Sequence, residues 1–143
     1  MELKLKHGID NLLFGMKEQD VTKILGKPDT QYKDEEENVV FMYNSRKLRL
    51  IFYKEEDFKL GYLTTTNPMV KIFHTTFLGK NWSDVYPVLE KNKLKVFETD
   101  TSEGMISYFN EENWLFIHID YNEIVKIELG AVFSDKDEFD WKF

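Results

Sequence analysis

A pattern of residues that occurs twice constrains the fold of this chain more than any other feature. Gly15 opens a short helical pattern that ends at Gly26 and Pro28, and Gly79 opens a similar pattern that ends near Leu89. Glycine suits the left-handed position beyond a helix end, and proline prevents the helix from resuming. Strand-like segments follow each pattern in a similar order. The sequence therefore predicts a duplicated unit of one helix and several strands.

We expect helices over 17–26 and 83–92, each with an apolar stripe at helical spacing. The second helix is expected to start near Ser83 rather than directly after Asn81. The later start keeps Pro87 near the first turn, where its missing N–H costs less. The expected strands and extended lead-in segments cover residues 3–14, 39–43, 48–53, 58–66, 69–78, 94–98, 105–109, 114–119 and 124–129.

These elements predict an α+β fold class. The expected architecture is two tandem units of a helix followed by an antiparallel meander, with the helices packed on one face of the sheet. A chain of 143 residues has the length of one domain. We therefore expect a single domain, 1–143, built of two repeats that cover about 1–67 and 68–143.

Composition narrows the range of partners and the cellular location. The net charge is −7, and residues 80–143 carry all of it, whereas residues 1–79 are balanced. An acidic surface repels nucleic acid and attracts basic proteins, although it is also typical of a solvated surface. The chain has no Cys, which excludes disulfides and thiolate metal sites. Because it shows neither a long apolar run nor a signal-peptide pattern, we predict a cytoplasmic protein without nucleic-acid or membrane partners.

Few residues are arranged for catalysis. The three histidines, His7, His74 and His118, are scattered, and neither a metal-binding pattern nor a glycine-rich phosphate loop is present. His118 could transfer protons from its strand, but a partly buried structural histidine is the simpler interpretation. The carboxylate clusters fall in polar turns rather than across a cleft, as paired acid–base catalysis requires. We predict no catalytic residue, no metal, no cofactor and no enzymatic activity.

The segment with the strongest binding character is the C-terminus, where carboxylates are mixed with aromatic side chains. Aromatic residues supply the buried anchors of protein interfaces, and charges set the association rate and the choice of partner. A tail that folds back over the core is the alternative. Together with the turn at residues 110–113 and the start of the predicted strand 114–119, this segment supplies the candidate partner-binding residues Glu111, Glu112, Trp114, Asp135, Asp137, Glu138, Phe139 and Trp141.

Residues 14–29 contain Gly-Met, a polar cap, a Val and then Leu-Gly-x-Pro. This pattern resembles a motif of the β-lactamase inhibitor protein fold and of the related small outer-membrane assembly lipoproteins. The resemblance implies a helix, or a pair of helices, packed on an antiparallel sheet, with the unit in tandem as in the inhibitor. The lipoproteins need a lipidated Cys and the inhibitor is usually disulfide-bonded, whereas this chain has no Cys. A Cys-free cytosolic version is similar in size and acidity to bacterial immunity proteins, which neutralise a cognate toxin.

The resemblance and the acidity together predict a non-enzymatic protein-binding inhibitor. In this hypothesis the chain is an immunity protein that neutralises a basic bacterial toxin by occluding its active or substrate-binding surface. The partner is then a basic protein, and the oligomeric state stays open. A small-ligand-binding or structural module without a toxin partner is the alternative, and an enzyme of unrecognised type is the third function class.

Overall fold

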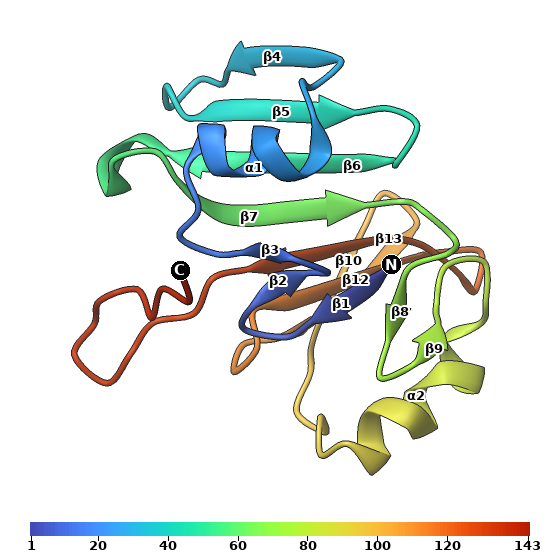
Figure 1. Cartoon of the computed structure of the whole chain (residues 1–143). Helices are drawn as coiled ribbons and strands as arrows, with labels where there is room; N and C mark the ends of the chain where they lie inside the picture. The colour runs from blue at the N-terminus through green and yellow to red at the C-terminus, as the bar shows by residue number, and fades with distance from the viewer.

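Strands dominate the computed structural model, which describes all residues from 1 to 143. Strands take up 43% of the chain and helical segments 15%. The larger sheet consists of β4 (Thr30–Lys33), β5 (Val39–Tyr43), β6 (Leu48–Tyr53), β7 (Lys59–Thr65), β10 (Glu98–Ser102), β11 (Met105–Asn110), β12 (Leu115–Asp120) and β13 (Glu123–Gly130). All its neighbouring strands are antiparallel, in the spatial order β10-β11-β12-β13-β7-β6-β5-β4 (Figure 1).

A smaller sheet draws its strands from two distant parts of the chain. Its strands are β1 (Glu2–Lys4), β2 (Gly8–Ile9), β3 (Leu12–Leu13), β8 (Lys71–Ile72) and β9 (Thr75–Thr76). Their order is β3-β2-β1-β8-β9, and β1 pairs with β8 in parallel. The helical segments are α1 (Glu18–Leu25), the short 3₁₀ turn η1 (Lys54–Glu56) and α2 (Trp82–Lys91). Neither α-helix is long and apolar enough to cross a membrane.

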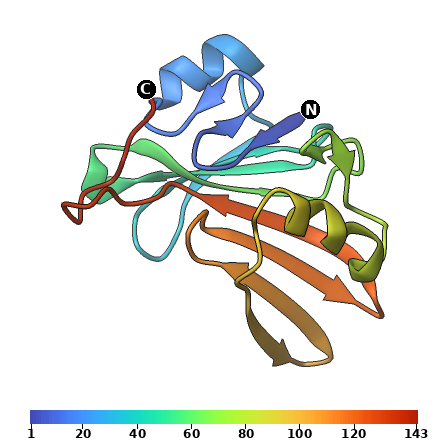
Figure 2. The ribbon, with the colours of Figure 1, turned by 90° about the horizontal axis from the view of Figure 1, so that it is seen from below.

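The helices and the smaller sheet lie together on one side of the larger sheet (Figure 2). A single hydrophobic core of 28 buried residues fills the space between these layers. In β6, every second residue from Leu48 to Phe52 is buried in this core, whereas the residues between them are half-buried on the opposite side. This alternation is the period of two that a strand with one covered face requires. We call the uncovered side of the larger sheet the outer face.

The two halves of the larger sheet meet where β7 pairs with β13. Leu63 lies opposite Leu129, and Thr65 lies opposite Ile127. All four residues are completely buried. This seam therefore joins the meander β4–β7 to the meander β10–β13 in one continuous sheet.

The prediction of an α+β fold with two tandem helix-plus-meander units is wrong. The fold is mostly β, with two large layers of strands. The lead-in segments 3–14 and 69–78 pair with each other, as when Leu3 lies opposite Ile72, and so build a second sheet across the predicted repeat boundary. That sheet, rather than a helical layer, covers the centre of the core. Each helix is short and buries few side chains, Val21 in α1 and Val85 and Leu89 in α2.

Individual elements also differ from the sequence prediction. The second helix begins at Trp82 directly after Asn81, so Pro87 lies inside it. Burial of the helix face that includes Val85 outweighs the loss of one hydrogen bond at the proline. Strand β4 was not predicted because its four residues are all exposed and carry no apolar alternation. Strand β10 begins at Glu98, where the predicted strand 94–98 would have ended.

The core predicts a stability difference between two aliphatic positions. Leu50 is completely buried and lies opposite Phe41 and Leu63 in the neighbouring strands. We expect Leu50→Ala to lower the free energy of unfolding by about 2–5 kcal/mol, because it removes buried surface and leaves a cavity. Val96 is 80% exposed, so Val96→Ala should change it by less than about 0.5 kcal/mol. Urea denaturation measures the free energy of unfolding of both variants. Equal losses in the two variants would contradict the described core.

Candidate functional site

The outer face carries both a hydrogen-bonded polar network and an aromatic cluster. Strand registers place its residues on one side, alternating with the core residues. Across β10, β11, β12, β13, β7, β6 and β5 they include Glu98, Asp100, Ser102, Met105, Ser107, Phe109, Phe116, His118, Asp120, Lys126, Glu128, Tyr62, Thr64, Arg49, Ile51, Tyr53, Val40 and Met42.

Four polar side chains from four neighbouring strands form a hydrogen-bonded network at the centre of this face. Ser107 Oγ lies 2.7 Å from His118 Nδ1. His118 Nε2 contacts a carboxylate oxygen of Glu128, and the Tyr62 hydroxyl donates to the other oxygen at 2.8 Å. The His118 and Glu128 side chains are only 13% and 20% exposed. The network crosses the seam, because Tyr62 belongs to β7 and Glu128 to β13.

The ionisation of Glu128 fixes the direction of the two hydrogen bonds that its carboxylate makes. Burial raises the pKa of Glu128, but the hydrogen bonds from His118 and Tyr62 outweigh it and bring the pKa below its ordinary value. Burial, followed by the neighbouring carboxylate, raises the pKa of Tyr62. Glu128 is therefore ionised and accepts from both Tyr62 and His118 Nε2–H. His118 Nδ1 and the Ser107 hydroxyl form the remaining hydrogen bond of the network.

A cluster of rings surrounds one end of the network. Phe109 and Phe116 are stacked with centroids 4.3 Å apart, and Trp114 meets Phe109 edge-on at 5.0 Å. The His118 ring lies parallel to Phe116 at 5.9 Å. Trp114 can lie flat on the sheet because Gly130 beneath it has no side chain: a Cβ there would be 2.4 Å from Trp114 Cδ1. These half-buried rings present a rigid apolar surface.

The Ser107–His118–Glu128 chain has the three residue types of a hydrolytic triad, but it lacks free backbone N–H groups beside its serine. In such triads backbone N–H groups stabilise the oxyanion beside the serine. Ser107 lies within β11, whose backbone pairs with β10 on one side and β12 on the other. The N–H groups beside Ser107 are therefore committed to the sheet. No group of three or more His, Asp and Glu side chains could hold a metal ion.

The predicted partner-binding residues fall into two groups. Glu111, Glu112 and Trp114 lie in the turn between β11 and β12, and Trp114 joins the aromatic cluster. Lys6 Nζ lies 3.8 Å from Glu112. The structure therefore brings only Trp114 of this group into contact with the outer-face cluster.

The second group lies in the C-terminal segment, which packs back on the molecule. The ring centroid of Phe139 lies 4.8 Å from that of Trp141 and 5.8 Å from that of Tyr53. Lys59 Nζ lies 5.5 Å from the centroid of the Trp141 ring. Both predicted anchors, Phe139 and Trp141, are thus engaged within the chain. The carboxylates of Asp135, Asp137 and Glu138 are exposed in the loop closed by the bridge between Phe133 and Phe139.

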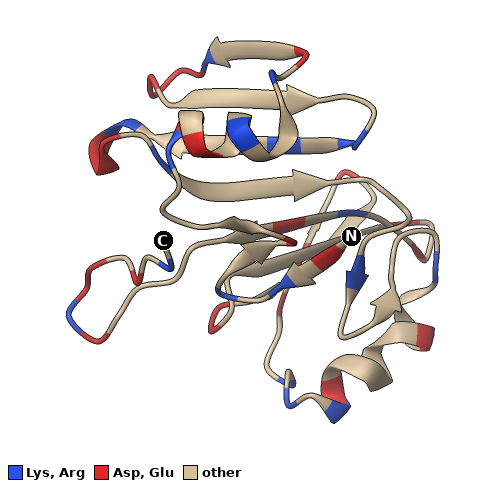
Figure 3. Ribbon diagram, viewed as in Figure 1, with Lys and Arg blue, Asp and Glu red and all other residues tan.

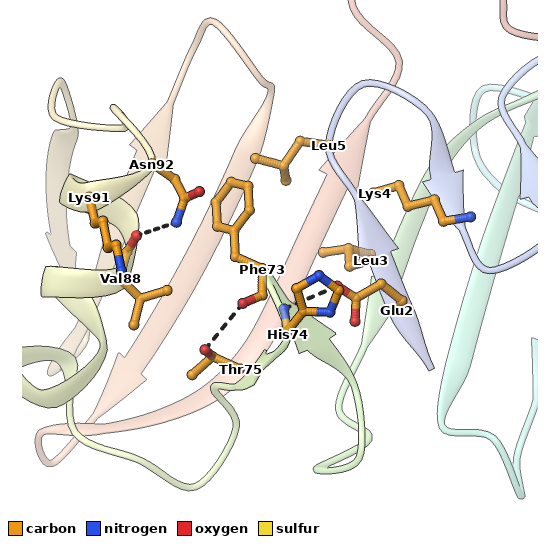
Figure 4. Close-up of a pocket in the computed structure, with 10 residues that line it drawn as sticks. All are labelled: Glu2, Leu3, Lys4, Leu5, Phe73, His74, Thr75, Val88, Lys91 and Asn92. Atoms are coloured by element: carbon orange, nitrogen blue, oxygen red, sulfur yellow. Dashed lines mark hydrogen bonds and ion pairs between the residues drawn. The ribbon is translucent and has the colours of Figure 1, made fainter.

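A separate cavity of about 560 Å³ lies between the smaller sheet and α2 (Figure 4). Phe73 lies between Leu5 and Val88, and the His74 N–H donates to Glu2 at 3.1 Å. Phe73 and His74 both have left-handed backbones, with φ of 51° and 63°. This conformation is uncommon for bulky residues. The cavity is mixed in character and open, and it does not adjoin the outer-face network.

Two solved structures share the fold. No protein-family model and no curated protein matches the chain. An extracellular protein containing an SCP domain from Bacillus anthracis str. Ames matches with a TM-score of 0.56 and 14% sequence identity, over 82% of this chain and 43% of that chain. A cysteine-rich secretory protein from Staphylococcus aureus subsp. aureus Mu50 matches with a TM-score of 0.51 and 10% identity, over 82% and 44%.

These matches correct the family resemblance. The chain spans less than half the length of either solved structure, and at these identities the likeness shows the fold alone. The matched proteins are SCP-containing and cysteine-rich secretory proteins, so the resemblance to the β-lactamase inhibitor fold and the interpretation as an immunity protein are wrong. The motif at 14–29 misled because a helix start, an apolar stripe and a Gly-x-Pro stop recur in unrelated folds.

Sequence reasoning missed three of the four network residues, Tyr62, Ser107 and Glu128. The available signal was that polar residues alternate with apolar ones along the predicted strands, which places them on an uncovered face. Whether these side chains can form hydrogen bonds with one another depends on the strand register. The register between β12 and β13 shifts between His118 and Ile119. A sequence pattern does not reveal such a shift.

The ionised Glu128 predicts a pH-dependent stability difference. Its pKa in the folded state is lowered from the ordinary value of 4.5. The stability that the carboxylate contributes is therefore present above pH 4.5 and is lost as the pH falls through the folded-state pKa. Wild type should exceed Glu128→Gln in free energy of unfolding most strongly above pH 4.5, by about 1–3 kcal/mol.

Urea denaturation at a series of pH values measures this difference. Glu35→Gln, at an exposed carboxylate with no hydrogen bond in the structure, is the matched control. A difference between wild type and Glu128→Gln that stayed constant down to the acid limit would show that Glu128 is not charged in the network.

Proposed function

We propose that this chain is a non-enzymatic protein-binding module that docks a basic protein segment on the β10–β13 part of its outer face. The observation that carries the proposal is a preorganised aromatic cluster, flanked by carboxylates, on the sheet face turned away from the helices and the smaller sheet (Figure 2). Aromatic side chains held rigid by their neighbours are typical anchors of protein interfaces.

The placement of charge supports a basic partner. Acidic residues occur in loops on several sides of the molecule, including the C-terminal loop, so the net charge alone does not select one face (Figure 3). On the β10–β13 part of the outer face, however, Glu98 lies opposite Phe109 and Asp120 lies opposite Met105. The carboxylates Glu98, Asp100, Asp120 and Glu128 outnumber the single cation Lys126 there.

The combination of rings and carboxylates suits lysine and arginine in particular. The long apolar stems of these residues pack on aromatic faces, and their charged ends reach neighbouring carboxylates. The rings of Phe109 and Phe116 are partly exposed on this face, and Glu98 offers a carboxylate in the same cross-strand row. An acidic or neutral partner would gain only the apolar part of this interaction.

The cavity beside α2 gives less support to the small-ligand alternative. Its charged lining residues include both carboxylate and amine groups, and the carboxylate of Glu2 is already engaged by the N–H of His74. No charged or polar group is held buried and unpaired there, as a preformed small-molecule site would require. The outer face is therefore the better supported site.

A random-peptide display library selected against the protein tests this proposal. We expect the selected peptides to be enriched in Lys and Arg next to aliphatic or aromatic residues. Affinity for such a peptide should fall at least about tenfold in the Glu98→Lys/Asp120→Lys variant, because the reversal replaces attraction by repulsion at the docking face. Isothermal titration calorimetry at low salt measures the dissociation constants.

Two matched variants carry the same change of charge elsewhere. Glu35→Lys/Glu90→Lys changes exposed residues away from the β10–β13 outer face, and Asp137→Lys/Glu138→Lys changes the C-terminal loop. Both should weaken binding less than the face variant does. Selection of no basic peptide would contradict the proposed function. A larger loss from the loop variant would move the docking site to the C-terminal segment.

A further inference from the structure

We propose that the basic segment binds as an added ninth strand at the free edge of β10. This inference rests on the proposed function and names its binding mode. The partner is an extended segment with Lys or Arg at every second residue. Main-chain hydrogen bonds to β10 provide the docking, and alternate side chains provide the selection.

Strand β10 presents an open row of backbone groups. It is the terminal strand of the larger sheet, and its ladder with β11 is continuous over five residue pairs from Glu98↔Phe109 to Ser102↔Met105. All five residues of β10 are exposed. No hydrogen bond outside this ladder uses the backbone of residues 98–102. Every second N–H and C=O of β10 therefore points outward without a partner in the chain.

Of the usual protections of an edge strand, β10 has only its two carboxylates, Glu98 and Asp100. Its sequence contains no lysine and no proline, and no bulge interrupts its pairing with β11. The opposite edge, β4, carries Lys33, and Gln31 there is bound at 3.3 Å by Glu18 of α1. The outermost strands of the smaller sheet have only two residues each. The edge at β10 is thus the one long open edge without a basic residue.

The charges of β10 select against a second copy of this chain. Glu98 and Asp100 lie on the outer face, and Thr99 and Thr101 lie on the other side. Pairing of two β10 edges would bring carboxylates next to carboxylates, and like charges on neighbouring strands are destabilising. A strand with Lys or Arg beside these two acids gains an opposite-charge pair at each position instead.

An added strand would also extend the cross-strand rows of side chains on the β10–β13 part of the outer face. One row runs Glu98, Phe109, Phe116 and the next runs Asp100, Ser107, His118. Basic residues of the new strand would extend both rows by one position, beside Glu98 and Asp100, with β10 between them and the aromatic cluster. On the other side of β10, Thr99 lies opposite Tyr108, whose ring is stacked on Trp82 at 4.0 Å. Apolar β-branched residues in the alternate positions suit that side.

The test uses a synthetic peptide that alternates Lys and Val, slightly longer than β10, with the full-length protein labelled for NMR. Hydrogen exchange of the outward backbone amides within 98–102 should slow at least about tenfold on saturation, because they enter a new ladder. Exchange in β4 should not change. A peptide of the same sequence with N-methyl groups on alternate amides keeps the charges but cannot pair along that edge, so it should bind at least about tenfold more weakly.

The outcomes separate this inference from the proposed function. Equal affinity of the N-methylated peptide, or shifts at Phe109 and Phe116 without protection in 98–102, would overturn strand addition and leave face docking in place. Failure of the alternating peptide to bind, when library-selected basic peptides do bind, would also overturn it. Protection of the same amides in concentrated protein without peptide would assign the edge to a second copy. If no basic peptide of either kind binds, the proposed function itself fails.

Discussion

The pairing of β7 with β13 is the interaction on which the rest of this structure depends. Without it, each meander would end in a strand whose inward side chains, Leu63 and Leu129, have no apolar neighbour on that side. Exposed apolar edges of this kind favour aggregation. With it, the two meanders share one covered face over a core of 28 residues and one continuous outer face. The free edges then fall at the polar strands β4 and β10.

The polar network on the outer face also depends on the pairing of β7 with β13. Tyr62 and Glu128 belong to different meanders and bond across the seam at 2.8 Å. Partly buried polar groups cost free energy unless each is satisfied, so the network favours one register of the seam over its alternatives. The same network holds His118 parallel to Phe116. The seam therefore positions both the binding surface and the charges around it.

The sequence predicted those elements whose physical signal is local. Alternation in 48–53 and the continuous β-prone run in 39–43 predicted β6 and β5, and the apolar stripe in 17–26 predicted α1 within one residue at each end. Strands of two residues, such as β8, are too short to show a period. The sequence pattern therefore did not show that they pair with strands far away in the chain. Because of this pairing, the fold is mostly β rather than the predicted α+β. The candidate residues in the tail were chosen on composition, which does not show that Phe139 and Trp141 pack on their own chain.

Native-state hydrogen exchange at increasing urea concentrations tests the central claim most directly, because the claim is that the seam makes one sheet and hence one outer face. The amides of β6 and of β12, on either side of the seam, should open with the same free energy, equal to that of global unfolding. If one meander opened at a clearly lower free energy than the other, with exchange of Leu63 following only one of them, the two halves would be separate units. The continuous binding face described here would then not exist.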